Sequence, residues 1–311
     1  MTSKKLRVAL LCGGVSGERA ISFKSGDQVA QALDPERYDV FRYDPATDLE
    51  RLLREAPGLD VALIILHGRW GEDGTIQGLL DLAGLPYQGS GVMSSALCMD
   101  KRVTKDLYRF HGLPVARDIV LDRRSPADLD EVVKEIGLPL VIKPNSEGSS
   151  LGMSIPRTRE ELEAGLAEAF LLDRYVMLEE YIQGREITVS VLGNDHLEAL
   201  PLVEIIPGEK YTFFDYEAKY EPGASKEICP APISEDLTHE AMEIGLAAHR
   251  VLYCRGYSRT DLMLRDGKYF VLETNTIPGM TGTSLFPQAA QAAGYSFGRL
   301  MDRLIELALE G

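Results

Sequence analysis

The chain has 311 residues, of which 45% are hydrophobic and 26% are charged, a composition typical of a folded globular protein rather than a disordered or fibrous one. Its formal net charge of −15 at pH 7 repels phosphate backbones and anionic lipid, so neither nucleic-acid nor membrane binding is expected as its main role. A small basic pocket for an anionic ligand stays compatible with this charge.

The apolar runs and the cysteines indicate the cellular setting. The longest apolar runs are far shorter than the ~18 residues needed to span a bilayer, and we identify no signal peptide. The four cysteines are widely spaced and form no C-x-x-C pair. Reduced thiols in the cytoplasm are the simplest expectation.

The N-terminal third of the chain alternates short β-like runs with helical stretches. This alternation predicts a parallel sheet with helical crossovers. Ligands of such sheets bind beyond the carboxyl ends of the strands, which is where the Gly-rich loops 13–18 and 67–74 fall. The predicted strands span residues 6–12, 38–43 and 59–66, and the predicted helices span residues 19–33 and 75–83.

The rest of the chain predicts two more lobes, so three lobes fit better than the two average domains that the length suggests. The expected boundaries are 1–98, 99–183 and 184–311. A polar, aromatic-rich stretch spans 207–229. Within it the segment 213–220 interrupts the sheet pattern, and it either closes over a site or packs permanently on the body. The expected strands are 116–121, 140–143, 175–180, 187–192, 197–204 and a pair within 257–275, and the expected helices are 101–110, 127–136, 159–170, 235–253 and 296–309.

The turn of the last predicted hairpin decides whether two acidic side chains, Asp261 and Glu273, share a face. A two-residue turn pairs Leu264 with Tyr269 and sends the two carboxylates to opposite faces. A three-residue loop, with Gly267 in the left-handed conformation, pairs Leu264 with the residue before Tyr269 and brings the carboxylates together. We expect this second arrangement. One face would then carry Arg259, Asp261, Glu273 and Asn275, and the other Leu262, Phe270 and Leu272.

This mixed face predicts a metal and phosphate site. Two carboxylates and an amide, without thiolate or imidazole, suit Mg²⁺ or Mn²⁺ rather than zinc, and a neighbouring arginine suits phosphate oxygens. A solvated hairpin with a cross-strand Arg–Glu pair is the alternative. The Gly-, Thr- and Ser-rich segment 276–284 favours the site, because a plain hairpin has no need of its backbone and hydroxyl donors.

A second signal is Lys143, which ends a predicted strand and precedes the small-residue loop 144–153. An ammonium and backbone N–H groups arranged in this way cradle phosphates, whereas the alternative is a flexible surface hairpin. The loop is not a Walker A motif, because G-x-x-x-x-G-K-[ST] is absent from the chain. Glu179 and Glu186 are weaker candidates for contacts with ribose hydroxyls and an adenine amino group, since adjacent acids on a strand more often face solvent. Lys101 is equally ambiguous, because most lysines at the start of a helix are solvated.

Together these motifs resemble the D-alanine–D-alanine ligases of the ATP-grasp superfamily, collinearly from Gly13 to Pro287. The resemblance implies an α/β ATP-grasp fold, with an N-terminal doubly wound parallel-sheet domain followed by two α+β lobes that clasp ATP. The motifs that carry it are Gly13-Gly14, Ser16, Glu18-Arg19, Ser22, His67-Gly68, Gly71-Glu72-Asp73-Gly74, Gly89-Ser90-Gly91-Val92, Met99-Asp100-Lys101, 143–152, 215–220, Glu273-Thr274-Asn275 and Pro278-Gly279-Met280-Thr281.

The implied reaction converts ATP and two D-alanines to ADP, phosphate and D-alanyl-D-alanine, a building block of peptidoglycan. One D-alanine carboxylate attacks the γ-phosphate to give an acyl phosphate, and the amine of the second then displaces phosphate through a tetrahedral intermediate. Such phosphoryl transfer needs neutralised oxygens and positioned reactants more than covalent help. The resemblance also implies two Mg²⁺ (or Mn²⁺) ions, a cytoplasmic location and a homodimer.

The resemblance assigns roles to residues by position. The metal ligands are Asp261, Glu273 and Asn275, and the ATP contacts are Lys101, Lys143, Ser150, Glu179, Glu186 and Lys219. The substrate contacts are Glu18, His67, Lys219, Tyr220, Arg259, Ser284 and Leu285. The catalytic set is Glu18, Ser150, Tyr220, Arg259 and the backbone N–H of Gly279.

Three other functions stay open at this stage. Enzymes that join D-alanine to D-serine or to D-lactate belong to the same enzyme class, although Tyr220 favours the ordinary dipeptide because lactate-using ligases usually replace it. A nucleotide-binding regulatory module would keep the fold without the chemistry, against which the intact charged set on the hairpin speaks. A scaffolding role is supported only by the alternative, purely structural interpretation of each motif.

Overall fold

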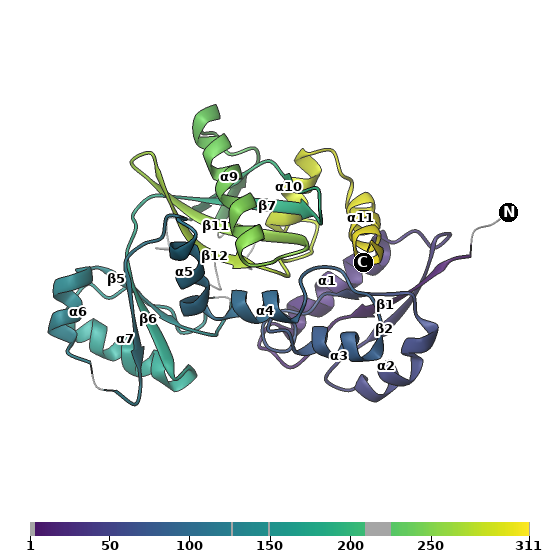
Figure 1. Ribbon diagram of the computed structural model, residues 1–311, viewed down its shortest axis with the longest axis horizontal. Helices are drawn as coiled ribbons and strands as arrows, with labels where there is room; N and C mark the ends of the chain where they lie inside the picture. Colours follow the sequence, from purple (N-terminus) through teal and green to yellow (C-terminus); the bar gives the residue numbers. More distant parts are fainter. Residues whose placement is uncertain (1–3, 126, 149, 209–224, 311) are drawn as a thin grey trace.

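The computed structural model describes residues 4–125, 127–148, 150–208 and 225–310. Three sheets with helices packed on them make up this part of the chain (Figure 1). Each sheet lies within one of the three segments 1–98, 99–183 and 184–311, which we propose as domains. The α/β fold class is therefore confirmed, with a parallel sheet first and two antiparallel sheets after it.

The N-terminal sheet is parallel and has the order β2-β1-β3. Its elements are β1 (Leu6–Leu11), α1 (Arg19–Ala32), β2 (Tyr38–Tyr43), α2 (Leu49–Glu55), η1 (Ala56–Gly58), β3 (Val61–Ile64), α3 (Thr75–Ala83) and α4 (Val92–Met99). Side chains of β1 alternate between two cores, with Val8 and Leu10 in one and Ala9 and Leu11 in the other. Both faces of the sheet are thus covered, as parallel sheets require. Neither α2 nor α4 is predicted from the sequence pattern, since α2 is short and α4 buries two serines rather than an apolar stripe.

The central sheet is antiparallel, in the order β4-β6-β5. Its elements are α5 (Lys101–Phe110), β4 (Asp118–Asp122), α6 (Leu129–Ile136), β5 (Leu140–Pro144), α7 (Arg159–Leu172) and β6 (Tyr175–Glu180), close to the predicted ranges. Leu162 of α7 and Val132 of α6 pack on Ile142 and Leu178 in one core. Asp100 begins α5, because its side chain accepts a hydrogen bond from the Val103 backbone N–H at 3.0 Å.

The C-terminal sheet is also antiparallel, in the order β10-β9-β7-β11-β12, with β8 beside β7. Its elements are β7 (Arg185–Gly193), β8 (Glu198–Ala199), β9 (Val203–Pro207), β10 (Ser225–Ile228), α9 (Glu235–Val251), β11 (Gly256–Arg265) and β12 (Lys268–Asn275). The predicted strand 197–204 is wrong, since it is divided into β8 and β9 around Pro201, which has no N–H for a ladder hydrogen bond. The polar stretch expected at 207–229 carries strand residues at both ends, because Ser225 of β10 pairs with Pro207 of β9, whereas the interruption predicted at 213–220 lies outside the described residues.

The hairpin of β11 and β12 reaches its register by a route that the sequence analysis does not predict. The turn has two residues, Asp266 and Gly267, with φ of 52° and 73°, so the expected three-residue loop is wrong and Leu264 pairs with Tyr269. A bulge then shifts the register between Asp261 and Leu262 and brings Asp261 opposite Glu273. The two carboxylates share a face for this reason.

The bulge also changes the neighbours of the two carboxylates. Leu272 is the extra residue, and it lines the same pocket as Asp261 and Glu273 instead of lying on the opposite face. Phe270 pairs with Met263, away from the core. Of the three apolar residues expected on the core face, Leu262 alone is in the core cluster.

The C-terminal end of the chain returns to the N-terminal sheet (Figure 1). After α10 (Leu285–Ala292), the helix α11 (Phe297–Leu309) packs on α1 and β3. Leu300 and Leu304 join Val8 and Leu63 in one core. The sequence analysis does not predict α10. No helix among the described residues is long and apolar enough to cross a membrane.

Two mid-helix glycines differ in how closely neighbouring elements approach them. A Cβ on Gly245 of α9 would lie 2.4 Å from Val189 Cγ1 of β7, whereas one on Gly78 of α3 would lie 3.6 Å from Val92 Cγ2. Gly245→Ala should lower the free energy of unfolding, because overpacking costs about 1–3 kcal/mol and the helix preference of Ala returns only about 1 kcal/mol.

Gly78→Ala is the matched control and should leave the free energy of unfolding unchanged or raise it by up to about 1 kcal/mol. Urea denaturation of both variants checks this. Equal effects of the two substitutions would show that α9 is not packed tightly on the sheet.

Candidate active site

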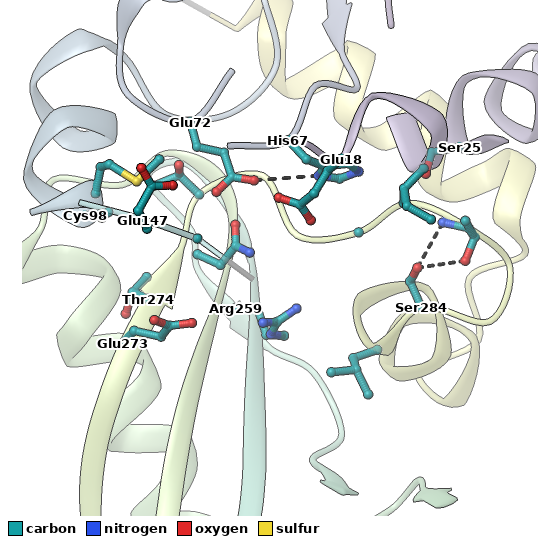
Figure 2. A pocket seen from close by; sticks show the side chains of 18 of the residues that line it. Glu18, Ser25, His67, Glu72, Cys98, Glu147, Arg259, Glu273, Thr274 and Ser284 are labelled. Carbon is teal, nitrogen blue, oxygen red and sulfur yellow. Dashed lines mark hydrogen bonds and ion pairs between the residues drawn. The ribbon is translucent and has the colours of Figure 1, made fainter. Parts of the chain in front are cut away.

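Two adjoining pockets lie where the three sheets meet. The first pocket is bounded on one side by α1, α4 and the loops after β1 and β3 (Figure 2). On the other side it is bounded by β11 and β12 around Arg259 and Asn275, and by the segment before α10. The second pocket lies between β5 and β6 on one side and β7, β11 and β12 on the other. The residues that line both are Lys101, Glu147, Gly148 and Glu273.

The structure brings the described members of the expected site to these two pockets. Around the first pocket it places Glu18, His67, Lys101, Arg259, Glu273, Asn275, Gly279, Ser284 and Leu285. Around the second it places Lys101, Lys143, Ser150, Glu179, Glu186, Asp261 and Glu273. Lys219, Tyr220 and the expected closing segment 213–220 lie outside the described residues.

Arg259 and Asp261, two residues apart on one face of β11, form a buried bidentate ion pair. Arg259 Nε lies 2.7 Å from Asp261 Oδ1, and Nη2 lies 2.8 Å from Oδ2. Burial works to lower the pKa of Arg259, but Asp261, Glu273 and Glu186 outweigh it and raise the pKa. The wall between the pockets therefore holds a guanidinium that stays charged beside these carboxylates, which suits the stabilisation of a developing oxyanion.

A buried ion pair also lines the second pocket. Lys143 Nζ of β5 donates to Glu179 Oε2 of β6. Burial favours the neutral form of Glu179, yet Lys143 and Lys105 lower its pKa to about 2. The same attraction, with that of Glu273, raises the pKa of Lys143 against its own burial. Both groups are thus charged at neutral pH, and Lys143 presents an ammonium to any ligand of this pocket.

The hairpin supplies a hard-oxygen donor set. Asp261 and Glu273 are directly opposed across the strands, and Asn275 lies two residues further along β12. Within the described residues, no three His, Cys, Asp or Glu side chains form a group that could hold a metal ion. The set is two carboxylates and one amide oxygen, which is the donor chemistry of Mg²⁺ rather than of zinc. With Glu186 nearby, the carboxylates also outnumber Arg259 at this wall, which favours a divalent cation.

His67 lies in the first pocket with its Nδ1 3.6 Å from Glu72 Oε1 (Figure 2). Burial lowers its pKa, but the neighbouring Glu72 carboxylate and the charge of Glu18 raise it above the ordinary value. The other ring nitrogen, Nε2, is buried and has no hydrogen-bond partner in the described part of the chain. An imidazole held in this way can give a hydrogen bond to an anionic group.

Two further hydroxyl groups line the first pocket, one from the segment 276–284 that is predicted to supply hydroxyl donors and one from α1, where the sequence predicts no site residue. Ser25 Oγ of α1 and Thr276 Oγ1 are buried and without a hydrogen-bond partner in the described structure. A buried unpaired hydroxyl costs about 1–3 kcal/mol, so two of them in one pocket indicate a polar ligand. Nothing in the sequence distinguishes Ser25 from an ordinary helix serine, and only the packing of α1 against this pocket identifies it.

The start of α10 faces the first pocket as well. Ser284 is the N-cap residue, but its Oγ accepts from the Thr281 backbone N–H at 3.1 Å and does not cap the helix. The first N–H groups of α10, beginning at Leu285, therefore have no side-chain cap. Backbone N–H groups and the helix dipole at such a position favour a carboxylate.

Three sheets around a lysine- and carboxylate-lined cleft define an ATP-grasp enzyme, the class to which the similar solved structures also belong. Family models for the D-ala D-ala ligase N-terminus and C-terminus match residues 45–90 and 107–306. The chain belongs to the D-alanine–D-alanine ligase family.

Relatives over the full length of the chain support this assignment. It is 61% identical over 310 residues to the D-alanine–D-alanine ligase of Syntrophobacter fumaroxidans, covering 100% of both chains. The ligase of Desulfotalea psychrophila is 53% identical, with coverage of 99% of this chain and 96% of that one. Among solved structures, the Bacillus anthracis ligase complexed with ATP is 35% identical, with a TM-score of 0.87 and 98% of each chain covered.

Proposed function

We propose that this chain joins two D-alanines into D-alanyl-D-alanine, with ATP converted to ADP and phosphate, to supply a peptidoglycan precursor. The observation that carries the proposal is the junction of the two pockets at Lys101, Glu147, Gly148 and Glu273. A nucleotide in the second pocket would direct its phosphates through this junction to a carboxylate bound in the first. Membership of the family adds the identity of the amino acid.

The second pocket suits a nucleotide. Val141, Met153 and Ile155 offer apolar surface for a purine ring. We assign the ionised Glu179 to the amino group of adenine and Glu186 to the ribose hydroxyls, since carboxylates accept hydrogen bonds from both. Lys101, Lys143 and Ser150 would contact the phosphates, and Lys219 is assigned with them by resemblance.

The first pocket suits two amino acids. Glu18 would hold the ammonium of the first D-alanine, with Ser150 and Tyr220 in the same set, and His67 would lie against that substrate. Ser284, the N–H of Leu285 and Lys219 would hold the carboxylate of the second. This arrangement places the amine of the second substrate against the activated carbonyl of the first.

The reaction then proceeds in two steps, phosphoryl transfer and displacement of phosphate by the amine. A carboxylate oxygen of the first D-alanine forms a bond to the γ-phosphorus, and the bond to the bridging oxygen breaks to release ADP. The deprotonated amine of the second D-alanine forms the C–N bond and gives up one further proton, the C–O bond to phosphate breaks, and the released phosphate takes up that proton. Arg259 and the Gly279 N–H would stabilise the oxyanion between these events.

Asp261, Glu273 and Asn275 would hold Mg²⁺, or Mn²⁺, as two ions. When bound, such ions neutralise the phosphate oxygens during transfer. The structural support is the donor set and the surplus of carboxylates at this wall. A cytoplasmic location, where ATP is available, and a homodimer are further parts of the proposal and rest on the resemblance.

The product from ATP, Mg²⁺ and a mixture of D-alanine, D-serine and D-lactate tests the function. Mass spectrometry should find D-alanyl-D-alanine as the main product at neutral pH, with one phosphate released per dipeptide. The mixture is needed because the D-Ala:D-Ser ligase VanG of Enterococcus faecalis is also similar, with a TM-score of 0.84 and 30% identity over 98% of this chain. Phosphate release that does not depend on an amino acid would refute the proposal.

Metal dependence should follow the two opposed carboxylates. Chelation by EDTA should abolish activity and added Mg²⁺ should restore it. Asp261→Asn and Glu273→Gln should each reduce activity at least about tenfold and raise the Mg²⁺ concentration for half-maximal rate, since a charged ligand is lost. The matched control is Asp266→Asn at the exposed hairpin turn, where Asn suits the left-handed conformation. Unchanged Mg²⁺ requirements in both site variants would remove the metal from this wall.

Ser25→Ala separates a ligand-binding hydroxyl from a structural one. We expect the KM for D-alanine to rise several-fold with the KM for ATP unchanged. The free energy of unfolding should stay constant or rise by up to about 1 kcal/mol, because an unpaired buried hydroxyl is removed. Ser125→Ala, at an exposed serine, is the control for steady-state kinetics and urea denaturation. A loss of stability with no change in either KM would contradict the assignment.

A further inference from the structure

Lys105 is a buried charge that the reaction does not use directly. Its side chain is 1% exposed, and it lines neither pocket. It lies on α5 one turn after Lys101 and contacts Glu179, which does line the second pocket. An ammonium in such a place has to be compensated by partners, because its burial is costly.

The three N–H donors of Lys105 have three acceptors. Nζ lies 3.2 Å from the Ala116 carbonyl oxygen and 3.0 Å from Asp118 Oδ1, and it also donates to Glu179 Oε1. The other oxygen of Glu179 accepts from Lys143. Each oxygen of the Glu179 carboxylate is therefore held by a different lysine, one behind the pocket wall and one in the pocket.

The sheet register explains why an ammonium is required here. Asp118 of β4 and Glu179 of β6 are direct cross-strand partners, 5% and 2% exposed. Like charges directly opposite each other destabilise a sheet, and burial strengthens the repulsion. Lys105 lies against both carboxylates. The alternating charges continue from Lys143 through Glu179, Lys105 and Asp118 to Arg109, which is 40% exposed.

We propose that Lys105 is a positioning residue that keeps Glu179 ionised and oriented toward the nucleotide, and thereby sets the preference for a 6-amino purine over a 6-oxo purine. An ionised carboxylate accepts a hydrogen bond from an amino group and repels a carbonyl oxygen, whereas a protonated carboxyl can donate to that oxygen. The inference rests on the proposed function through the assignment of Glu179 to the base.

Removal of Lys105 should weaken the preference for a 6-amino purine over a 6-oxo purine, and this effect should be larger at low pH. Lys105 is one of the two charges that hold the pKa of Glu179 low, so Lys105→Met raises this pKa. The population of the neutral form of Glu179 then rises as the pH falls. In the wild type Glu179 stays ionised at all assay pH values, since its pKa is about 2.

The test is equilibrium binding of ATP and ITP by calorimetry between pH 6 and 8.5. The wild type should prefer ATP, with a preference independent of pH. In Lys105→Met the ratio of ATP affinity to ITP affinity should fall about tenfold or more at pH 6, which corresponds to the loss of one hydrogen bond to a charged group. Part of this ratio should return at high pH. Lys105→Arg should retain it. Lys134→Met, at an exposed lysine of the same lobe, is the control.

The double variant Lys105→Met/Asp118→Asn takes the place of the single variant in the same measurement if the single variant does not fold. It removes the carboxylate that faces Glu179, so folding and the preference for ATP should both return in part. A purely structural role predicts equal weakening of ATP and ITP binding instead.

The inference is overturned by a wild type that does not distinguish ATP from ITP, or by a Lys105→Met variant that keeps the wild-type ratio at every pH. Dipeptide synthesis by the wild type is measured separately. Selective ATP binding without synthesis would refute the proposed function while leaving the role of Lys105 supported.

Discussion

The cross-strand pairing of Asp261 with Glu273 is the constraint on which the rest of the site depends. β11 is hydrogen-bonded to β7 on one side and to β12 on the other, so its residues cannot move independently of the sheet. The bulge sets which β12 residues face Asp261. Arg259, two residues earlier on β11, is fixed by the same pairing and by its bidentate contact with Asp261. The register of β11 and β12 thus positions the guanidinium of Arg259, the carboxylates of Asp261 and Glu273, and with them the wall between the two pockets.

Charge compensation organises the cleft around this wall. Arg259 is balanced by Asp261, and Glu179 by two lysines, so each buried charge has a partner that offsets the cost of its burial. These networks also determine the protonation states, because the pKa of Glu179 falls to about 2 despite burial. The net charge of −15 therefore does not describe the site, whose lysines and arginine are concentrated where anionic groups would bind.

The three segments are less independent than their separate sheets suggest. The N-terminal parallel sheet needs cover on both faces, and α11 at the other end of the chain supplies part of it. The segment between β12 and α10 lines the first pocket, and Gln28 of α1 accepts a hydrogen bond from the backbone N–H of Gly282 at 2.7 Å. The first pocket is therefore formed jointly by the two ends of the chain, and its shape depends on how they pack.

The sequence by itself determined the fold class, most strands and helices, and the family, because hydrophobic period and collinear local motifs are properties of neighbouring residues. It missed the division of 197–204 at Pro201, and it reached the shared face of Asp261 and Glu273 through the wrong turn. Only the tertiary structure decided the bulge at Leu272, the unpaired hydroxyl of Ser25 in the first pocket and the position of Lys105 between Asp118 and Glu179. Each of these depends on register or on packing between distant segments, and no local pattern in the chain encodes such contacts.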